Sequence, residues 1–323
     1  MEYRTLAHTD LKVSRLSFGT MLFGSQADEP GACRLVDRCL EAGINFFDTA
    51  NIYNQGLAET ILGKALAGRR ANVVLATKVR HKMENAPEET GLSRAAVHKA
   101  IESSLRRLGT DYADIYYLHQ PDYDVPIEET LAAMDELVRA GKVRYPAVSN
   151  YAAWQVGEIH WICEKSGFRP PYISQPMYNL LARGVEEEYL PFCQRFGVAV
   201  IPYNPLAGGL LTGKHSRQQG PAAGTRFAGN KLYLDRYWHA DYFAAVEELA
   251  AIAREAGKTL VELSFQWLLS QPVVDSIILG ASRLEQLEEN LKACEGGPLD
   301  ESVLARCDAV WKRLRGITPK YNR

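Results

Sequence analysis

The stretch Phe46-Phe47-Asp48-Thr49-Ala50-Asn51-Ile52-Tyr53 decides which fold the chain predicts, because it joins an apolar run to polar residues at its end. Two phenylalanines precede the carboxylate of Asp48, and Tyr53 follows five residues later. The apolar run starts directly after Gly43, and glycine is common just past a helix end because it accepts positive φ. The stretch therefore predicts a strand over 44–47 that follows a helix and ends in a polar loop.

Two later apolar runs end in a similar way. Lys78 directly follows the apolar run 73–77, and His119 directly follows the run 115–118. If these strands are parallel, their carboxyl ends meet at one edge of a sheet, where neighbouring strands lie ~4.8 Å apart. One polar residue at a strand end is usually only a surface residue, but chance rarely gives three successive strands the ends Asp, Lys and His. We therefore expect these three side chains to share a pocket with Tyr53.

Helix and strand patterns alternate along most of the chain. Eight strands are expected, at 13–18, 44–47, 73–77, 114–118, 142–149, 172–175, 198–203 and 276–279. Helices are expected at 30–42, 59–66, 93–108, 127–140, 153–166, 186–196, 241–256, 260–270, 283–293 and 301–314, and a long polar loop at 207–235. Such alternation implies parallel strands with right-handed crossovers, and eight units favour a closed (β/α)8 barrel over an open sheet.

Additions to this α/β barrel are expected at both ends of the chain. Residues 3–13 predict an N-terminal β-hairpin, and the C-terminal tail is expected over the active-site face. No change of composition marks a boundary, so we expect residues 1–323 to form a single domain. In such barrels the active site lies at the C-terminal ends of the strands, which is where Asp48, Lys78 and His119 are predicted.

The composition excludes several classes of partner. With 46% hydrophobic and 24% charged residues and a net charge of -2, the 323-residue chain predicts a globular protein with no electrostatic preference for nucleic acid or an anionic membrane. No signal core or membrane span is visible at the start or elsewhere. The six cysteines form no CxxC pair, which favours buried thiols in a reducing compartment and hence a cytoplasmic protein.

The four predicted pocket residues suit carbonyl reduction. A tyrosine with a pKa of about 10 is protonated at neutral pH and can donate a proton to a developing alkoxide. Lys78 would lower the pKa of Tyr53, Asp48 would hold the lysine, and His119 could orient a carbonyl oxygen. The seven histidines are scattered and neither HExxH nor GxSxG occurs, so no metal site and no serine hydrolase is expected. A cofactor would have to supply the hydride.

These residues also carry a resemblance to a known family. Residues 43–50 together with Tyr53 look like the first signature of the aldo-keto reductase superfamily, and Lys78 and His119 stand where that family has its other catalytic residues. Further specific matches are Ser149-Asn150-Tyr151, the run 204–214 and Gly280-Ala281-Ser282-Arg283. The match covers nearly the whole chain, and it implies Tyr53 as the general acid.

The resemblance implies a nicotinamide cofactor bound along the barrel rim. Ser149, Asn150 and Gln175 would hold the carboxamide, and Tyr203 would stack on the ring. Arg283, with Ser282, would bind the 2′-phosphate, which favours NADPH over NADH; an arginine at a helix N-terminus also suits a phosphate physically. The residues assigned to the cofactor are Gly19, Thr20, Met21, Asp48, Ser149, Asn150, Gln175, Tyr203, Asn204, Pro205, Leu206, Gly208, Leu210, Lys214, Arg226, Gly280, Ser282, Arg283, Gln286, Glu289 and Asn290.

Residues 208–214 also match GxxxxGK, the start of a P-loop. The next residue is His215 rather than Ser or Thr, and the run 218–221 does not continue a helix, so nucleotide hydrolysis is not expected. No GxGxxG occurs, which leaves a Rossmann site without support. We expect instead a loop over the cofactor diphosphate, with Arg226 as its clamp.

Within the superfamily, the chain from Ser149 onward most resembles the aflatoxin-aldehyde and succinic semialdehyde reductases. The residues that carry this likeness are 151–154, 177–179, 235–238 and 319–323. The front half, at 16–21 and 91–94, looks more like bacterial and channel-β-subunit members. The residues expected to contact a carbonyl substrate are Met21, Tyr53, His119, Trp154, Tyr178, Arg236 and Arg323. Two functions follow: an NADPH-dependent aldehyde or ketone reductase, or a cofactor-binding subunit that reports redox state with little turnover.

Overall fold

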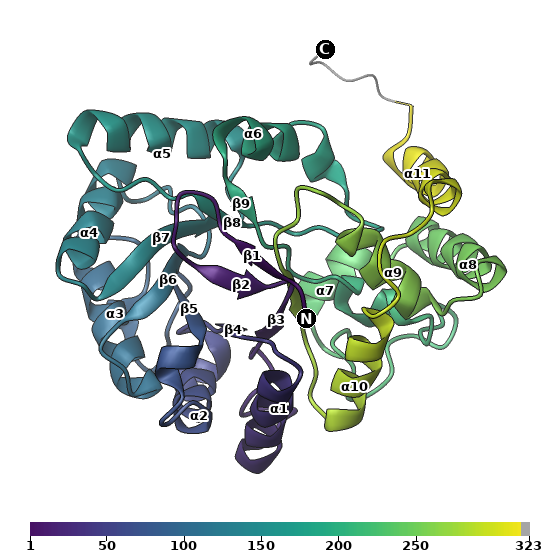
Figure 1. Cartoon of the computed structure of the whole chain (residues 1–323), viewed down its shortest axis with the longest axis horizontal. Coiled ribbons are helices and arrows are strands. Elements are labelled where there is room, and N and C mark those ends of the chain that lie inside the picture. Colours follow the sequence, from purple (N-terminus) through teal and green to yellow (C-terminus); the bar gives the residue numbers. More distant parts are fainter. Residues whose placement is uncertain (318–323) are drawn as a thin grey trace.

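The computed structural model describes residues 1–317, and its centre is a curled sheet of eight parallel strands (Figure 1). The strand order is β10-β3-β4-β5-β6-β7-β8-β9, so neighbours in sequence are neighbours in the sheet. The strands are β3 (Leu16–Gly19), β4 (Phe46–Asp48), β5 (Val74–Val79), β6 (Ala113–Leu118), β7 (Val143–Ser149), β8 (Ile173–Gln175), β9 (Ala199–Val200) and β10 (Ile277–Leu279).

The two edges of this sheet meet and close a barrel. Val200 forms a parallel bridge with Val274, and its carbonyl accepts from the Asp275 amide at 2.9 Å. The amide of Ile278 donates to the carbonyl of Pro202 at 3.2 Å. These bonds join β9 to the segment that leads into β10, and the predicted (β/α)8 barrel is confirmed.

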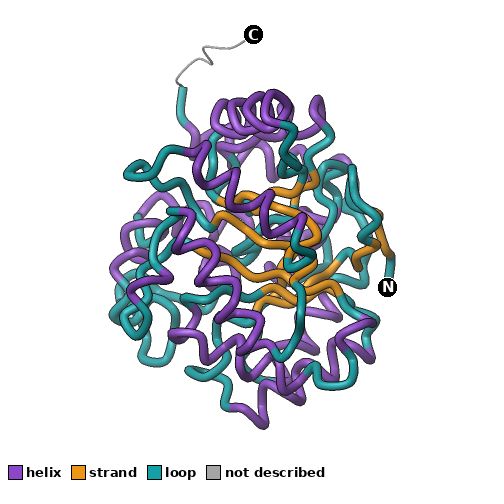
Figure 2. Tube along the Cα trace, turned by 90° about the vertical axis from the view of Figure 1, so that its left-hand side faces the viewer, coloured by secondary structure: helices purple, strands orange, loops and turns teal. Residues whose placement is uncertain are grey.

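Helices surround the barrel, and in the view of Figure 2 they lie outside the strands on both sides. They are α1 (Glu29–Glu41), α2 (Leu57–Ala65), α3 (Arg94–Leu108), α4 (Ile127–Arg139), α5 (Ala153–Ser166), α6 (Tyr189–Phe196), α7 (Lys231–Tyr237), α8 (Ala240–Glu255), α9 (Leu260–Leu269), α10 (Leu284–Ala293) and α11 (Glu301–Arg315). Local sequence sets their ends. The hydroxyl of Ser93 accepts from the Ala96 amide at the start of α3, and Gly109, with φ 64°, ends that helix.

The N-terminal hairpin closes the end of the barrel that faces the viewer in Figure 1. It consists of β1 (Tyr3–Thr5) and β2 (Lys12–Ser14), which pair antiparallel. Its buried side chains Leu6, Leu11 and Val13 join the inner core of the barrel. The predicted hairpin is thus confirmed, and it leaves the opposite end of the barrel as the open one.

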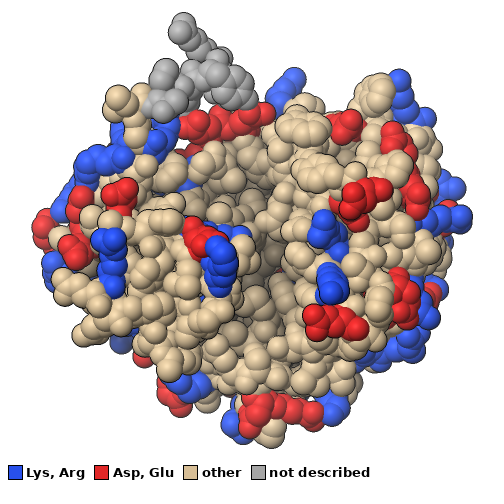
Figure 3. Space-filling model, turned by 180° about the vertical axis from the view of Figure 1, so that it is seen from behind, with Lys and Arg blue, Asp and Glu red and all other residues tan. Residues whose placement is uncertain are grey.

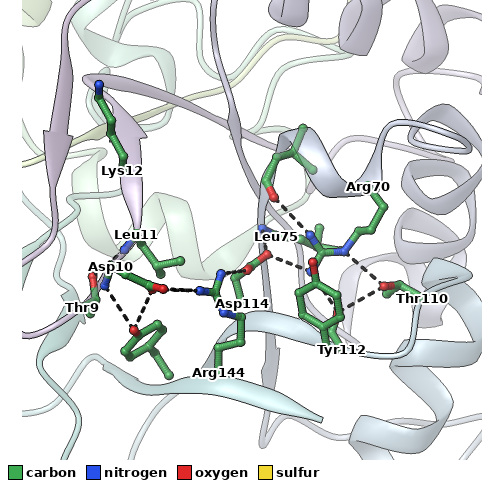
Figure 4. Close-up of polar contacts among 12 residues, drawn as sticks. Thr9, Asp10, Leu11, Lys12, Arg70, Leu75, Thr110, Tyr112, Asp114 and Arg144 are labelled. Carbon is green, nitrogen blue, oxygen red and sulfur yellow. Dashed lines mark hydrogen bonds and ion pairs between the residues drawn. The ribbon is translucent and has the colours of Figure 1, made fainter. Parts of the chain in front are cut away.

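A chain of ion pairs fastens the hairpin to the barrel (Figure 4). Arg144 lies between two carboxylates, with Nη2 at 2.8 Å from Asp10 Oδ2 and Nη1 at 2.7 Å from Asp114 Oδ1. The other oxygen of Asp114 lies 2.8 Å from Arg70 Nη2. Asp114 is buried at the start of β6, so this network holds its charge between two guanidinium groups at the end of the barrel far from the predicted site.

The structure corrects several predicted element boundaries. The strand expected at 198–203 is only Ala199–Val200. The expected strand at 13–18 is two strands, because Ser14 still pairs with β1 whereas Leu16 already pairs with β10. The helix expected from residue 186 begins at Tyr189, after a short 3-10 turn. The expected loop 207–235 contains a 3-10 segment and most of α7. The C-terminal tail expected over the active-site face lies outside the described residues.

Candidate active site

The open end of the barrel carries a hollow, which Figure 3 shows in the middle of the face opposite to that of Figure 1. A cavity of about 350 Å³ lies between the loops that follow β3 and β4 and residues 225–230. Its walls include Met21, Tyr53, Asn54 and Arg226. The side chain predicted to act as the acid therefore lines an accessible cavity.

Lys78 and Asp48 form a buried ion pair beside this cavity. The two side chains come from adjacent strands, and Lys78 is fully buried while Asp48 is 2% exposed. The Nζ of Lys78 also donates to the carbonyl of Thr49 at 2.7 Å. The second carboxylate oxygen of Asp48 accepts from Gln175 Nε2 at 2.8 Å. Since an unpaired buried charge is costly, these partners explain how a lysine stays inside the barrel.

Tyr53 reaches the lysine from a tight turn. Its hydroxyl lies 3.4 Å from Lys78 Nζ. The next three residues all have positive φ, at 48° for Asn54, 54° for Gln55 and 90° for Gly56. Left-handed backbone is strained in residues other than glycine, so tertiary contacts must hold this turn. One of them is the hydrogen bond from Asn54 Nδ2 to the carbonyl of Phe23, at 2.5 Å.

The pKa of Tyr53 differs from the prediction in the direction of its shift. Burial, followed by the nearby Asp48 carboxylate, raises the pKa of Tyr53 well above its usual value, although Arg226 opposes the shift. The expected net lowering of the pKa of Tyr53 by Lys78 is therefore wrong for this structure, because burial dominates. Burial also lowers the pKa of Lys78, against the opposing effect of Asp48. Tyr53 is protonated here, as a proton donor must be.

His119 lies next to Tyr53 with its ring edge-on, at a centroid distance of 6.0 Å. Burial first, and then the positive charge of Lys78 and the neighbouring His81, lower the pKa of His119 well below its usual value. The imidazole is therefore neutral at pH 7, with one N–H donor. Among residues 1–317 its Nδ1 has no hydrogen-bond partner. A neutral histidine here can donate to a carbonyl oxygen without transferring its proton.

The residues predicted to hold a nicotinamide carboxamide form one hydrogen-bonded chain. The hydroxyl of Tyr203 donates to Asn150 Oδ1 at 2.8 Å, and Asn150 Nδ2 donates to Ser149 Oγ at 3.0 Å. Ser149 Oγ donates to the carbonyl of Gln175 at 2.8 Å. Because Gln175 also bonds Asp48, the chain runs from the predicted cofactor site to the ion pair. The structure thus brings these two predicted groups together.

A second predicted cofactor group lies where β10 leads into α10. Arg283 is exposed at the N-cap position of α10, and Ser282 Oγ lies 3.1 Å from Gln286 Oε1. Asn290 Nδ2 donates to the carbonyl of Gly280 at 3.2 Å. A Cβ placed on Gly280 would meet no atom within 4 Å, so there is open space beside this backbone. Glu289 is exposed on the same helix.

The run after β9 forms a folded 3-10 segment, Ala207–Thr212, and not the helix of a P-loop. Asn204 holds it, because its Oδ1 accepts from the Gly208 amide at 2.6 Å. Leu210 is buried and Leu206 packs against the core, so these two support the segment. Pro205 and Lys214, which are also predicted to bind the cofactor, lie just before and just after this 3-10 segment. Arg226 reaches back over the cavity, with Nη1 3.5 Å from the hydroxyl of Tyr233.

The predicted substrate residues do not all lie together. Met21 lines the cavity with Tyr53, and Arg236 lies near Tyr203, whose pKa it lowers against the larger effect of burial. Trp154 is 64% exposed at the start of α5.

Two predicted substrate contacts receive no support. Tyr178 is fully buried, its hydroxyl donates to Glu186 at 2.6 Å, and its ring packs against Trp267. It contributes to a different cavity from the one that Tyr53 lines, and this placement does not favour contact with a substrate. Arg323 lies outside the described residues.

Sequence reasoning missed two residues at the site. His81 lies with its ring 4.4 Å from that of His119 and edge-on to it. Tyr233, on α7, faces Arg226 and contributes to the raised pKa of Tyr53. The position of His81 three residues after Lys78, beyond the end of the same strand, was a usable signal. The position of Tyr233 was not, because α7 was expected to be loop.

The described residues contain neither a metal-binding cluster nor a membrane-spanning helix. No group of three or more His, Cys, Asp or Glu side chains within residues 1–317 could hold a metal ion. No helix in the same part of the chain is long and apolar enough to cross a membrane.

A barrel whose open end joins a buried Lys–Asp pair, a protonated tyrosine and a neutral histidine defines an oxidoreductase that acts on carbonyl groups. Residues 15–312 match the model of the Aldo/keto reductase family. The chain belongs to that family, and the resemblance drawn from the sequence is confirmed.

The chain is similar to several named proteins over nearly its whole length. It is 38% identical to the "Probable voltage-gated potassium channel subunit beta" of Oryza sativa subsp. japonica, over 99% of this chain and 100% of that protein. It is 38% identical to the "Uncharacterized oxidoreductase YrpG" of Bacillus subtilis (strain 168), over 99% of both chains. It is 37% identical to the human "Aflatoxin B1 aldehyde reductase member 2", over 94% of this chain and 88% of that protein.

Proposed function

We propose that this protein reduces aldehydes or ketones to alcohols with NADPH, and that Tyr53 is the general acid. The observation that carries the proposal is the 3.4 Å separation between the Tyr53 hydroxyl and the buried Lys78 Nζ, beside a neutral His119. The similarity to a human aflatoxin aldehyde reductase supports a carbonyl substrate.

Each group has one task in this reaction. A nicotinamide cofactor, when bound, would supply the hydride that the carbonyl carbon receives. Tyr53 donates its proton to the carbonyl oxygen as negative charge develops there, and Lys78 stabilises the phenolate that remains. Asp48 keeps Lys78 charged and in place. The N–H of His119 orients the carbonyl oxygen toward the Tyr53 hydroxyl. Solvent then returns a proton to Tyr53.

The residues at the barrel rim fit NADPH. The open space beside Gly280 leaves room for a ligand against the backbone, and the exposed Arg283 places a guanidinium at the N-terminus of α10. A helix N-terminus and an arginine both favour a phosphate, which NADPH carries on its adenosine ribose and NADH lacks. Asn150 and Gln175 would exchange some of their present hydrogen bonds for those of the nicotinamide carboxamide.

We place the protein in the cytoplasm. All six of its cysteines are free, and four of them are buried, as expected for thiols in a reducing compartment.

The proposal is tested with NADPH and a panel of carbonyl compounds: 4-nitrobenzaldehyde, methylglyoxal, succinic semialdehyde and a quinone. At least one should be reduced by the wild-type protein, and Tyr53→Phe should bind NADPH equally well but reduce none at a comparable rate. Full activity of Tyr53→Phe would contradict the role of Tyr53. No turnover of any compound would contradict the reductase function.

The second candidate is a redox-sensing subunit that binds NADPH and turns over slowly. The similarity to a protein named as a probable potassium channel β subunit favours it. Tight NADPH binding with negligible turnover of the whole panel, together with co-purification of a membrane protein, would support this function. Rapid turnover of one carbonyl compound would favour the reductase.

A further inference from the structure

A second carboxylate lies behind the strand that carries Lys78. Glu59, on α2, is fully buried, and its Oε1 accepts from the Thr77 hydroxyl at 2.5 Å. Thr77 directly precedes Lys78, and successive side chains of a strand point to opposite faces. Glu59 therefore holds β5 from the helix side, one residue away from the lysine that faces the barrel interior.

The other oxygen of Glu59 binds an arginine that touches the turn of Tyr53. Arg107 Nε donates to Glu59 Oε2 at 2.7 Å. A Cβ placed on Gly56 would lie 2.7 Å from Arg107 Cδ and 2.8 Å from its Nε, so the guanidinium stem lies directly on the glycine backbone. Gly56, with φ 90°, ends the strained turn that begins at Tyr53. Arg107 thus presses on the far end of that turn.

We propose that Glu59 and Arg107 are a positioning pair, which fixes the separation between the Tyr53 hydroxyl and Lys78 Nζ. Through Thr77 the pair holds the strand of Lys78, and through Gly56 it holds the turn of Tyr53. This role rests on the proposed function of those two residues in proton transfer. Neither Glu59 nor Arg107 lines the cavity that Tyr53 lines.

The negative charge of Glu59 also affects the pKa of Lys78. Replacing a buried ion pair with apolar side chains often costs no stability, so core packing alone does not require Glu59. Its carboxylate helps to keep the pKa of Lys78 up against the effect of burial. Among residues 1–317, the titratable groups around Lys78 are Asp48, Tyr53, Glu59, His81, Tyr117 and His119. Of these, Glu59 is the one that acts from behind the strand.

Glu59→Gln tests the proposal, with Asp114→Asn as the matched control. Both remove a fully or nearly fully buried carboxylate that binds arginine, but Asp114 lies at the opposite end of the barrel. Both should lower the denaturation midpoint. Only Glu59→Gln should lower kcat per folded molecule, by about ten- to a hundredfold, because small displacements of reacting groups are costly. The KM for the carbonyl compound should change little.

The pH profile adds a readout that a purely structural role would not change. Without the charge of Glu59 the pKa of Lys78 falls, so Lys78 loses its proton at lower pH. The alkaline limb of kcat should therefore move to lower pH in Glu59→Gln and stay in place in Asp114→Asn. Arg107→Lys, which keeps the charge but loses the flat contact with Gly56, should lower kcat and leave the alkaline limb nearer to that of the wild type.

The outcomes separate this proposal from the proposed function. If kcat and the alkaline limb of Glu59→Gln and Arg107→Lys match those of Asp114→Asn, the positioning role is wrong. Should Glu59→Gln fail to fold, Arg107→Lys decides by its kcat alone. Tyr53→Phe is measured in parallel: an inactive Tyr53→Phe beside a fully active Glu59→Gln overturns only the positioning pair, whereas a fully active Tyr53→Phe overturns the proposed function.

Discussion

The Nζ of Lys78 lies 3.4 Å from the hydroxyl of Tyr53 and is held there by Asp48, with which it forms a buried ion pair. The lysine comes from β5 and the tyrosine from the loop after β4, so the barrel itself sets their distance. Burial keeps Tyr53 protonated. The ammonium group of Lys78 is close enough to stabilise a Tyr53 phenolate. In the reaction we propose, proton donation by Tyr53 therefore depends on the charge of Lys78, which the fold keeps buried.

Asp48→Asn should destabilise the protein and narrow its active pH range. Removing one partner of a buried ion pair leaves an uncompensated charge, so the free energy of unfolding should fall by about 3–5 kcal/mol. Asp48 also raises the pKa of Lys78, so activity should be lost at lower pH than in the wild type. Urea unfolding and a pH–rate profile measure both. The control is Glu29→Gln, which breaks an exposed pair with Lys64 and should cost about 0–1 kcal/mol.

His119 should make the fold sensitive to acid. The pKa of His119 lies well below 6.5, so between that lowered value and 6.5 the unfolded chain binds a proton that the folded protein does not. Its contribution to stability is complete above pH 6.5 and is lost as the pH falls toward the folded pKa. His119→Gln should flatten this dependence in unfolding experiments. An unchanged slope in His119→Gln would contradict the neutral state of the imidazole.

Arg283→Ala should weaken NADPH and spare NADH. A hydrogen bond to a charged group contributes about 1.5–3 kcal/mol, which corresponds to roughly a ten- to hundredfold increase in the Kd for NADPH. The Kd for NADH should stay the same, because NADH has no 2′-phosphate. Fluorescence titration with each cofactor measures the two constants. Lys292→Ala, near the other end of α10, is the control, and equal loss of both cofactors in Arg283→Ala would rule out 2′-phosphate recognition.

Asp114→Asn should lower the stability of the protein without changing its kcat. It breaks the network between the hairpin and the barrel shown in Figure 4, and its two arginine partners lose their shared carboxylate. We expect a loss of about 3–5 kcal/mol in the free energy of unfolding. The kcat of the folded protein should not change, because the network lies at the closed end of the barrel. A large fall in kcat without loss of stability would contradict this division.

The strand patterns predicted the barrel well, because each apolar run must be buried and each ends at a polar residue. They failed where pairing partners change within a run, as at Arg15, where the chain passes from the hairpin to the barrel. Such a break depends on tertiary contacts and leaves no trace in the local pattern. The helix α7 was expected to be loop because it is only seven residues long, and so short a helix depends on tertiary packing more than on local pattern.

The candidate site was predictable in part. Asp48, Lys78 and His119 were visible as strand ends, and the structure brings them together around Tyr53, while their catalytic roles stay predictions. The contact between Glu59 and Arg107 was not visible, because the two residues lie on different helices and are 48 positions apart in sequence. The predicted direction of the shift in the pKa of Tyr53 was also wrong, since the degree of burial cannot be derived from neighbouring residue types.

The measurement that tests the central claim most directly uses NADPH with deuterium at both C4 positions of the nicotinamide, and follows the deuterium into the alcohol formed from 4-nitrobenzaldehyde. We predict that the wild type forms deuterated alcohol, with one NADPH consumed per alcohol. We predict that Tyr53→Phe binds NADPH as tightly but forms the alcohol at least about a hundredfold more slowly. Alcohol without deuterium, or equal rates for the two proteins, would contradict hydride transfer with Tyr53 as the proton donor.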